Sequence, residues 1–521
     1  MYAKLFPASL LLASVFLVAC QSDIDADYLI KGGHVYLGDN TESIAVDIAV
    51  QGENIVFIGT PSKHINAETI LDVSGLIVAP GFIDPHTHSL SDLQSGEAPR
   101  RENANYRLQG VTTVFNGNDG YGSANITELS QGLLDNGIGS NTAFFVGHGA
   151  VRRKIMGNDD RAPSQDELES MKVLIAEAME EGALGLSTGL FYAPGSFSDT
   201  DEIVELAKIA AAKGGVYESH IRDESTYNIG LEASIEEVLE IGRRANIPVH
   251  IAHIKALGVD VWGKSTPIIE TIEKARADGL VVTADQYPWP ASGTRISNAL
   301  IPRRLKAGGV EKYMARLNDP VLHEPLKLDV AENLRRRGGA EAVLITDKNS
   351  QWRGKTLGEI SRLNKLTPTD MAIQIARDGD AKIASFNMSE DDITNFMVQD
   401  WVMTSSDGDQ GHPRKYASFP RKFEIYVRGQ NIMPIETFLY KSSGLVADTF
   451  NICERGYLKA GYKADIVIFN PETFKAKADF QNPEILSEGV KYLFVNGTLA
   501  VEDGQSNSSL SGKVLKRCTH Q

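Results

Sequence analysis

The chain has 521 residues, of which 42% are hydrophobic and 23% are charged, and its formal net charge at pH 7 is −16. Such a length and composition belong to a globular protein with a sizeable core, built as two to four ordinary domains or as one large barrel with a satellite domain. The acidic balance argues against nucleic acid as a partner.

The N-terminus differs in composition from the rest of the chain and reads MYAKLFPASLLLASVFLVAC. Lys4 is followed by an apolar stretch of roughly 14 residues, which is too short for a membrane span and predicts a signal peptide over residues 1–19. The LVAC ending resembles a bacterial lipobox, in which Cys20 becomes the lipidated first residue; an ordinary signal peptide with a chance cysteine is the alternative. Because Gln21 rather than Asp follows Cys20, we expect a lipid-anchored protein of the bacterial cell envelope, in the outer membrane and facing the periplasm.

Short apolar runs typical of strands then recur along the chain, with helix-like segments between several of them. In chain order these runs are LIVAPGFIDPHTH, VTTVFNGND, NTAFFVGHG, GALGLSTG, GGVYESHIR, IPVHIAHIK, LVVTADQYP and WVMTSSDG. Segments such as SQDELESMKVLIAEAMEEG and SIEEVLEIGRRA place apolar residues at three- and four-residue spacing, which indicates amphipathic helices. Strands alternating with helices predict a parallel sheet, and eight such strands predict an α/β fold of the TIM-like (β/α)8 barrel type.

Both ends of the chain depart from this alternation. Residues 26–80 and 445–515 are strand-rich and predict one small β-sandwich domain formed by both termini around a barrel at 81–444. Cys453 and Cys518 lie at this end of the chain; in an exported protein they could form a disulfide or remain two free thiols.

A long segment, residues 296–395, separates the last two predicted barrel strands and is helical and charged in pattern. It is too long for an ordinary connection, so we expect an inserted lid or subdomain.

Residues able to bind a metal fall at the ends of four predicted strands. His86 and His88 are two positions apart, so in an extended strand both imidazoles face the same side. His220, His253 and Asp407 follow three later strands. In a barrel the carboxyl ends of the strands converge on the catalytic face, and imidazole with carboxylate suits Zn²⁺ and related metals.

Other candidates are weaker. Asp119 ends the stretch VTTVFNGNDG, where an Asp–Gly pair is either turn chemistry or a carboxylate delivered to the site by a strand end. His148 lies on the same predicted rim and His412 follows Asp407 closely, so both are open as contributors. His250 is three residues before His253 and should point away from it in a strand.

Two motifs resemble the amidohydrolase superfamily, namely GFIDPHTH near the start and GYLKAGYKADIVIFNP near the end. More narrowly, GLSTGLFYAPG, YESHIRDE, AHIKALG, ADQYPWPASGT and SSDGDQGHPRKYASFPR resemble the N-acyl-D-amino acid deacylases, or D-aminoacylases. The resemblance covers nearly all of residues 26–500. It implies a (β/α)8 barrel with a small β domain, one or two divalent metal ions such as Zn²⁺, and hydrolysis of the amide of N-acyl-D-amino acids.

The resemblance assigns metal ligands and one departure from them. It places His86, His88 and Asp407 around one metal, and it matches His220 and His253 to the ligands of the other. The family carries a cysteine in a GNCG turn where this chain reads GNDG, so Asp119 stands at the thiolate position. A carboxylate is a harder ligand and can bridge two metals; the site would then be properly binuclear, or it would hold metal poorly in a degenerate relative.

The resemblance also implies the substrate side of the site. Lys255 and Arg414 would bind the α-carboxylate of the D-amino acid, although either could instead be a solvated loop charge. Tyr287 and Ser292 would assist, and Tyr192 would line the pocket. Asp407 would take a proton from the attacking water and pass it to the departing amine.

Alternative functions remain at this stage. Dipeptides ending in a D-residue present the same bond and carboxylate, and other amidohydrolase reactions include cyclic-amide opening and dipeptide hydrolysis. A non-catalytic envelope lipoprotein on a decayed barrel is a further alternative. The sequence leaves open the metal identity and count, the D-side-chain preference and the oligomeric state.

Overall fold

The structure is a computed structural model that describes residues 24–61 and 64–518. The expected signal peptide at 1–19 and Cys20 lie outside the described residues. Within these ranges, no helix is both long and apolar enough to cross a membrane.

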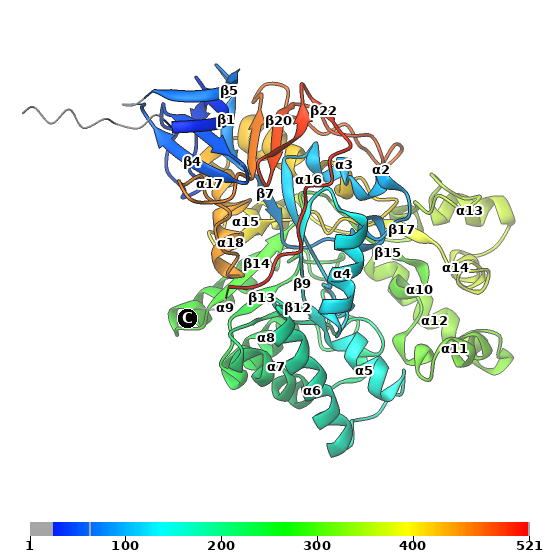
Figure 1. Cartoon of the computed structure of the whole chain (residues 1–521). Coiled ribbons are helices and arrows are strands. Elements are labelled where there is room, and N and C mark those ends of the chain that lie inside the picture. Colours follow the sequence, from blue (N-terminus) through cyan, green and yellow to red (C-terminus); the bar gives the residue numbers. More distant parts are fainter. Residues whose placement is uncertain (1–23, 62–63, 519–521) are drawn as a thin grey trace, which may run out of the picture.

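The centre of the molecule is a barrel of parallel strands (Figure 1). Strands pair in the order β7–β8–β9 and β10–β11–β12–β13–β14–β18, and the parallel bridge Thr87–Gly408 joins the first strand to the end of the last. The fold is therefore the expected (β/α)8 barrel. Its strands are β7 (Phe82–Asp84), β8 (Val111–Asn116), β9 (Asn141–Phe144), β10 (Val146–Gly147), β11 (Gly185–Gly189), β12 (Val216–His220), β13 (Val249–Ile251), β14 (Val282–Gln286) and β18 (Val402–Thr404).

Amphipathic helices cover the barrel. In α6 (Gln165–Glu181), Ser164 and Glu167 form a capping box, and Met171, Ile175 and Ala178 face the core at three- and four-residue spacing. The helix stops at Gly182, which adopts the left-handed conformation. The other covering helices are α4 (Ile126–Asn136), α5 (His148–Met156), α7 (Thr200–Ala212), α8 (Leu231–Ala245), α9 (Ser265–Ala277), α15 (Glu390–Met397), α16 (Arg414–Lys422), α17 (Ile435–Lys441) and α18 (Gly444–Thr449), with short helices α1 (Leu90–Leu93), α2 (Ala98–Arg101) and α3 (Ala104–Arg107) after β7.

A β-sandwich lies against one end of the barrel (Figure 1). One sheet has the order β4–β3–β1–β5 and comes from the N-terminal segment; the other, β2–β6–β19–β20–β21–β22, combines both ends of the chain. Apolar residues from both sheets, including Ile30, Val50 and Ile468, share one core. The strands are β1 (Ile24–Lys31), β2 (His34–Val35), β3 (Asp47–Gln51), β4 (Asn54–Gly59), β5 (Ile65–Asp72), β6 (Ile77–Pro80), β19 (Ile466–Phe469), β20 (Val490–Val495), β21 (Thr498–Glu502) and β22 (Gln505–Ser506).

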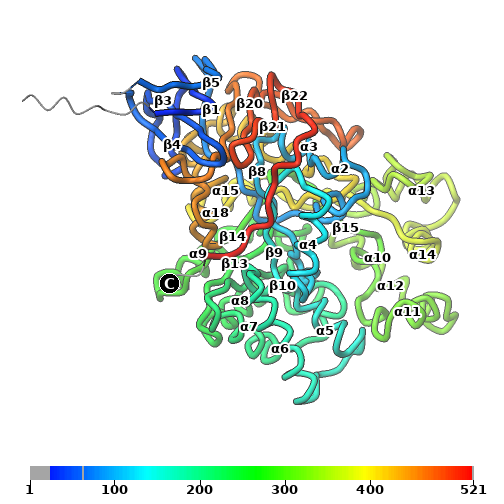
Figure 2. Tube along the Cα trace, viewed as in Figure 1, coloured from blue at the N-terminus to red at the C-terminus, as the bar shows by residue number. Residues whose placement is uncertain are grey.

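The C-terminal part of the sandwich is shorter than the expected 445–515. Val446 on α18 and Phe450 just after this helix belong to a cluster of barrel residues that includes Phe115, and not to the sandwich core. After β22 the chain leaves the sandwich and runs down across the barrel (Figure 2). There it bonds to β9, and a disulfide joins Cys453 to Cys518 with 5.7 Å between their Cα atoms.

The expected insertion is a subdomain with its own core (Figure 1). It begins earlier than residue 296, because its three-stranded antiparallel sheet includes β15 (Ala291–Arg295) with β17 (Lys382–Phe386) and β16 (Val343–Ile345). The end expected at residue 395 is also displaced, since α15 packs against α9 and β18 of the barrel. Its helices are α10 (Ile296–Ala299), α11 (Val310–Leu317), α12 (Pro320–Arg336), α13 (Leu357–Asn364) and α14 (Pro368–Arg377).

Candidate metal centre

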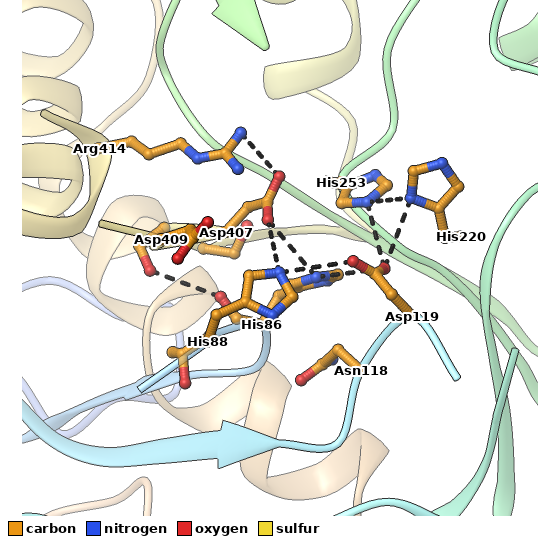
Figure 3. Close-up of polar contacts among 12 residues, drawn as sticks. His86, His88, Asn118, Asp119, His220, His253, Asp407, Asp409 and Arg414 are labelled. Atoms are coloured by element: carbon orange, nitrogen blue, oxygen red, sulfur yellow. Dashed lines mark hydrogen bonds and ion pairs between the residues drawn. The ribbon is translucent and has the colours of Figure 1, made fainter. Parts of the chain in front are cut away.

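Six side chains converge at the carboxyl ends of the barrel strands (Figure 3). They fall into two groups that share one aspartate, and within each group the ligand atoms all lie within 4.8 Å of one another. The first group is His86, His88, Asp119 and Asp407, and the second is Asp119, His220 and His253. The sequence predicted this set, although most of these residues lie just beyond the strands rather than in them.

Asp119 lies between the two groups. Its Oδ1 is 3.5 Å from Nε2 of His86 and 3.5 Å from Nδ1 of His220. The same oxygen is 3.4 Å from Nε2 of His253, and Oδ2 is 3.4 Å from Nε2 of His88. The carboxylate of Asp119 thus faces all four imidazoles. This is the arrangement expected of a bridging ligand, and not of a residue that only stabilises the turn after β8.

The turn after β8 presents this carboxylate through an unusual backbone. Asp119 has φ of 57°, in the left-handed region that Asp and Asn tolerate better than other side chains, and Gly120 follows at 76°. A Cβ on Gly120 would lie 2.9 Å from the backbone nitrogen of Gly189, so this position requires glycine. The Asp–Gly pair is therefore turn chemistry and site chemistry at once.

Asp407 joins the first group to the substrate side of the cavity. Its Oδ1 is 3.2 Å from Nε2 of His88 and 3.7 Å from Nε2 of His86. Its Oδ2 lies 2.8 Å from Nη1 of Arg414. The backbone nitrogen of Asp407 donates to the carbonyl of His86 at 2.9 Å, which fixes the two strand ends relative to each other.

The donor set fits a divalent cation. His86 Nε2 and Asp119 Oδ1 are buried and have no hydrogen-bond partner among the described residues. Burial would raise the pKa of Asp119, but the charge on His86 and the neighbouring imidazoles of His220 and His253 hold that pKa well below its usual range. For His88 burial lowers the pKa, yet Asp119 and Asp407 raise it to about 9. The carboxylates thus favour positive charge at the point where the imidazoles meet.

A buried polar layer that the sequence did not reveal lies behind His86. Nδ1 of His86 is 3.6 Å from Oδ2 of Asp285 and 3.8 Å from Oε1 of Glu218. The same Asp285 oxygen is 3.0 Å from Nε2 of His250. His250 is outside both ligand groups, as expected, but it supports the carboxylate behind a ligand.

A second unanticipated residue, Glu224, supports the other group. Lys255 Nζ donates to Oε1 of Glu224 at 2.5 Å and lies 2.6 Å from Nδ1 of His253. Burial would raise the pKa of Glu224, but the charge of Lys255 holds it well below its usual range. Lys255 is therefore already paired within the protein.

The two groups open into a cavity of about 230 Å³. All five residues expected on the substrate side line it: Tyr192, Lys255, Tyr287, Ser292 and Arg414. The guanidinium of Arg414 lies over the ring of Tyr287 at 4.6 Å. The hydroxyl of Tyr287 is buried and has no partner among the described residues.

The two histidines left open by the sequence do not line this cavity. His148 is buried against Glu202, with 2.8 Å between Nε2 and Oε1. His412 Nε2 is 3.1 Å from the carbonyl of Ala291, and its Nδ1 accepts from the backbone nitrogen of Arg414 at 3.1 Å. His412 therefore positions Arg414 from behind.

A (β/α)8 barrel with this histidine and aspartate set is of the amidohydrolase class, and the Amidohydrolase family matches residues 69–294. The chain is 32% identical to a D-aminoacylase of Alcaligenes xylosoxydans xylosoxydans, over 94% of this chain and 98% of that protein. It is 31% identical to an N-acyl-D-glutamate deacylase of the same organism, over 94% and 96%. The chain belongs to the D-aminoacylase family of amidohydrolases.

Solved structures agree with this membership. A D-aminoacylase crystal structure superimposes with a TM-score of 0.81 at 30% identity, covering 94% of this chain and all of that one. The N-acyl-D-glutamate deacylase of Bordetella bronchiseptica, complexed with zinc and a phosphonate mimic of the tetrahedral intermediate, gives 0.78 at 29% identity over 94% and 100%.

Proposed function

We propose that this protein is a metal-dependent deacylase that cleaves N-acyl-D-amino acids into a D-amino acid and a carboxylate. One observation carries the proposal: Asp407 touches the histidines of the metal centre through one oxygen and Arg414 through the other. A single cavity thus joins hydrolytic groups to a cation able to bind a substrate carboxylate. Family membership and the names of the relatives support the same reaction.

The ligand groups suggest two divalent cations, with zinc favoured because a relative binds it. His86, His88 and Asp407 would hold one, His220 and His253 the other, and Asp119 would bridge them. Such a cation, when bound, lowers the pKa of water and polarises the scissile carbonyl.

Asp407 moves the proton in this proposal. Burial would raise the pKa of Asp407, but the charge of Arg414 holds that pKa well below its usual range, so the carboxylate is ionised before water attacks. The carboxylate of Asp407 takes the proton from the attacking water, and the pair between Oδ2 and Arg414 keeps the carboxylate in position. The proton then passes to the departing amine nitrogen, which cannot leave as an anion.

The substrate is oriented by other groups that line the same cavity. Arg414 binds the α-carboxylate, supported by Tyr287 and Ser292, while Tyr192 forms part of the wall nearer His220. Both cations are paired within the protein, Lys255 with Glu224 and Arg414 with Asp407, but Arg414 is paired through Nη1 only, so the rest of its guanidinium can bind the substrate carboxylate. The cavity would hold three groups of the substrate in place: the scissile carbonyl, the amide nitrogen and the α-carboxylate. With these three groups fixed, only one enantiomer has room for its side chain.

A panel of N-acetyl-D- and N-acetyl-L-amino acids, hydantoins and dipeptides tests the proposal on metal-loaded protein. We expect hydrolysis of the D-acyl series at rates at least about 100-fold above the L-series, and a loss of about 10²–10⁴ in kcat for Asp407→Asn. Equal rates on both enantiomers, or activity confined to hydantoins or L-dipeptides, would refute it.

We also propose that the protein is anchored to the envelope by lipid on Cys20, facing the periplasm. The proposal rests on the LVAC ending and Gln21. Full-length protein expressed in a Gram-negative host should incorporate labelled palmitate and sediment with outer membranes, whereas Cys20→Ala should do neither. An unlabelled, soluble wild-type protein would contradict it.

A further inference from the structure

Arg337 is a buried cation in the wall of the catalytic cavity. It follows the last residue of α12, is 2% exposed, and lines the same cavity as Asp119 and Asp407. No carboxylate lies within ion-pair distance of its guanidinium among the described residues, and its Nε has no hydrogen-bond partner there. Burying an unpaired charge is costly, so such a group at a cavity wall indicates an anionic ligand.

The other charges of the cavity neutralise one another. Arg414 is paired with Asp407 and Lys255 with Glu224. Asp409, which also lines the cavity, is paired with Lys382 of the inserted subdomain. Arg295 also lines the cavity, but its side chain is exposed to solvent. Arg337 is thus the buried cation that the described residues leave for a ligand.

Arg337 lies close to the groups assigned to the α-carboxylate. With the Asn387 amide oxygen turned toward it, Nη1 of Arg337 donates to that oxygen at 3.1 Å. The same oxygen then accepts from the hydroxyl of Ser292 at 3.1 Å. One amide group therefore links Arg337 to Ser292.

The surroundings of Arg337 are cationic as well. The guanidiniums of Arg303 and Arg337, neither of them ion-paired among the described residues, lie 5.9 and 5.6 Å from the ring centre of Tyr227. Their summed field adds to the attraction for negative charge.

We propose that Arg337 binds a carboxylate on the side chain of the D-residue, so that the substrates are N-acyl derivatives of acidic D-amino acids, D-glutamate or D-aspartate. The inference rests on the proposed deacylase function and on Arg414 holding the α-carboxylate. The guanidinium of Arg337 offers two parallel donors to a carboxylate on the substrate. A substrate with a neutral side chain would leave the charge of Arg337 buried and unpaired.

The test compares kcat/KM for N-acetyl-D-glutamate and N-acetyl-D-glutamine, which have nearly the same shape but differ in charge, with the aspartate and asparagine pair alongside. We expect the acidic substrate to be preferred on the order of 30-fold or more. Arg337→Met should bring the ratio near one while changing the rate on the amide substrate only a few-fold. Arg336→Met is the matched control, because Arg336 is ion-paired with Glu332 and lies outside this cavity.

The outcomes separate the two proposals. Hydrolysis of D-series amides without a preference for acidic side chains, or an unchanged ratio in Arg337→Met, would overturn the inference and leave the deacylase function standing. No hydrolysis of any N-acyl-D-amino acid would overturn both. Should Arg337→Met fail to fold, the wild-type preference and competitive inhibition by D-glutamate against D-glutamine still decide.

Discussion

Asp119 is the residue that the two ligand groups of the metal centre share. Its two oxygens face four imidazoles at 3.4–3.5 Å, with Oδ1 shared among three of them. A carboxylate in this place is hard, anionic and able to use both oxygens. A carboxylate shared by both groups therefore favours two similar metal sites.

Replacing the carboxylate by a thiolate should change metal selectivity. In Asp119→Cys we expect the preference for Zn²⁺ over Mn²⁺ to rise on the order of tenfold, because thiolate is a softer ligand. Competition dialysis with metal analysis measures this ratio. Asp409→Cys places a thiol in the same cavity outside both ligand groups, so it should leave the ratio unchanged. An equal rise in both variants would show that the effect does not come from the bridge.

Metal binding should release protons at neutral pH. Burial lowers the pKa of His88, but Asp119 and Asp407 raise it to about 9, so this imidazole is protonated at pH 7 in the metal-free protein. A cation must displace that proton, and affinity should therefore rise about tenfold per pH unit per proton up to pH 9. Calorimetry in two buffers of different ionisation enthalpy counts the protons. No proton release at pH 7, with affinity flat between pH 6 and 9, would contradict the assignment.

The metal ligands could be predicted from the sequence, whereas the residues that support those ligands could not. The four histidines and Asp407 were found because strand ends in a barrel converge on one face. Glu224 and Asp285 were missed, because a carboxylate that supports a ligand has no spacing rule along the chain. Arg337 was missed since its helix belongs to an insertion, and nothing local indicates that it reaches the barrel cavity.

At the scale of elements, adjacent barrel strands carry the buried polar residues that lie behind the metal ligand His86. Asp285 on β14 lies between His86 and His250, with 3.6 Å and 3.0 Å to their ring nitrogens. It orients His86 so that Nε2 faces Asp119. Parallel strands make this possible, because His250 on β13 pairs in register with Thr283, which is two residues before Asp285 and on the same face of β14.

Removing the negative charge behind His86 should weaken metal binding without touching a ligand. In Asp285→Asn we expect affinity to fall about 10- to 100-fold, since the imidazole loses its charged partner. Chelator competition measures the affinity. Asp392→Asn is the matched control: this buried carboxylate accepts from the backbone of Gly263 and Ser265, away from the cavity. A comparable fall in the control would point to general destabilisation instead.

Element types were predictable to the extent that local pattern decides them. Eight apolar runs and two amphipathic helices were identified correctly, but the first run divides into β6 and β7, which belong to different domains. A continuous apolar run gives no sign of such a division, because both strands are buried. The sheet of the insertion was missed for a related reason: β15 and β16 are separated by 47 residues and pair only through β17.

At the scale of the whole molecule, the two ends of the chain enclose the barrel. The N-terminal segment and residues 466–506 build the sandwich, and the final segment then returns to the barrel. There Thr142 on β9 exchanges backbone hydrogen bonds with Lys513 and Leu515. The disulfide between Cys453 and Cys518 holds the end of this segment to the loop after α18.

Opening this disulfide should cost stability but little activity. It closes a loop of 65 residues, and constraining the unfolded chain to that extent is worth roughly 2–4 kcal/mol. We expect Cys518→Ser to lower the free energy of unfolding by about that amount in guanidinium titrations. Because neither cysteine lines the cavity, kcat/KM should change less than about twofold. The Cys453→Ser/Cys518→Ser double variant and the reduced wild type should match the single variant, since all three lose the same bond. A further loss in the double variant would show that Cys453 contributes through packing. An unchanged wild type after reduction would show that the bond is not formed, which would weigh against the proposed export to the periplasm.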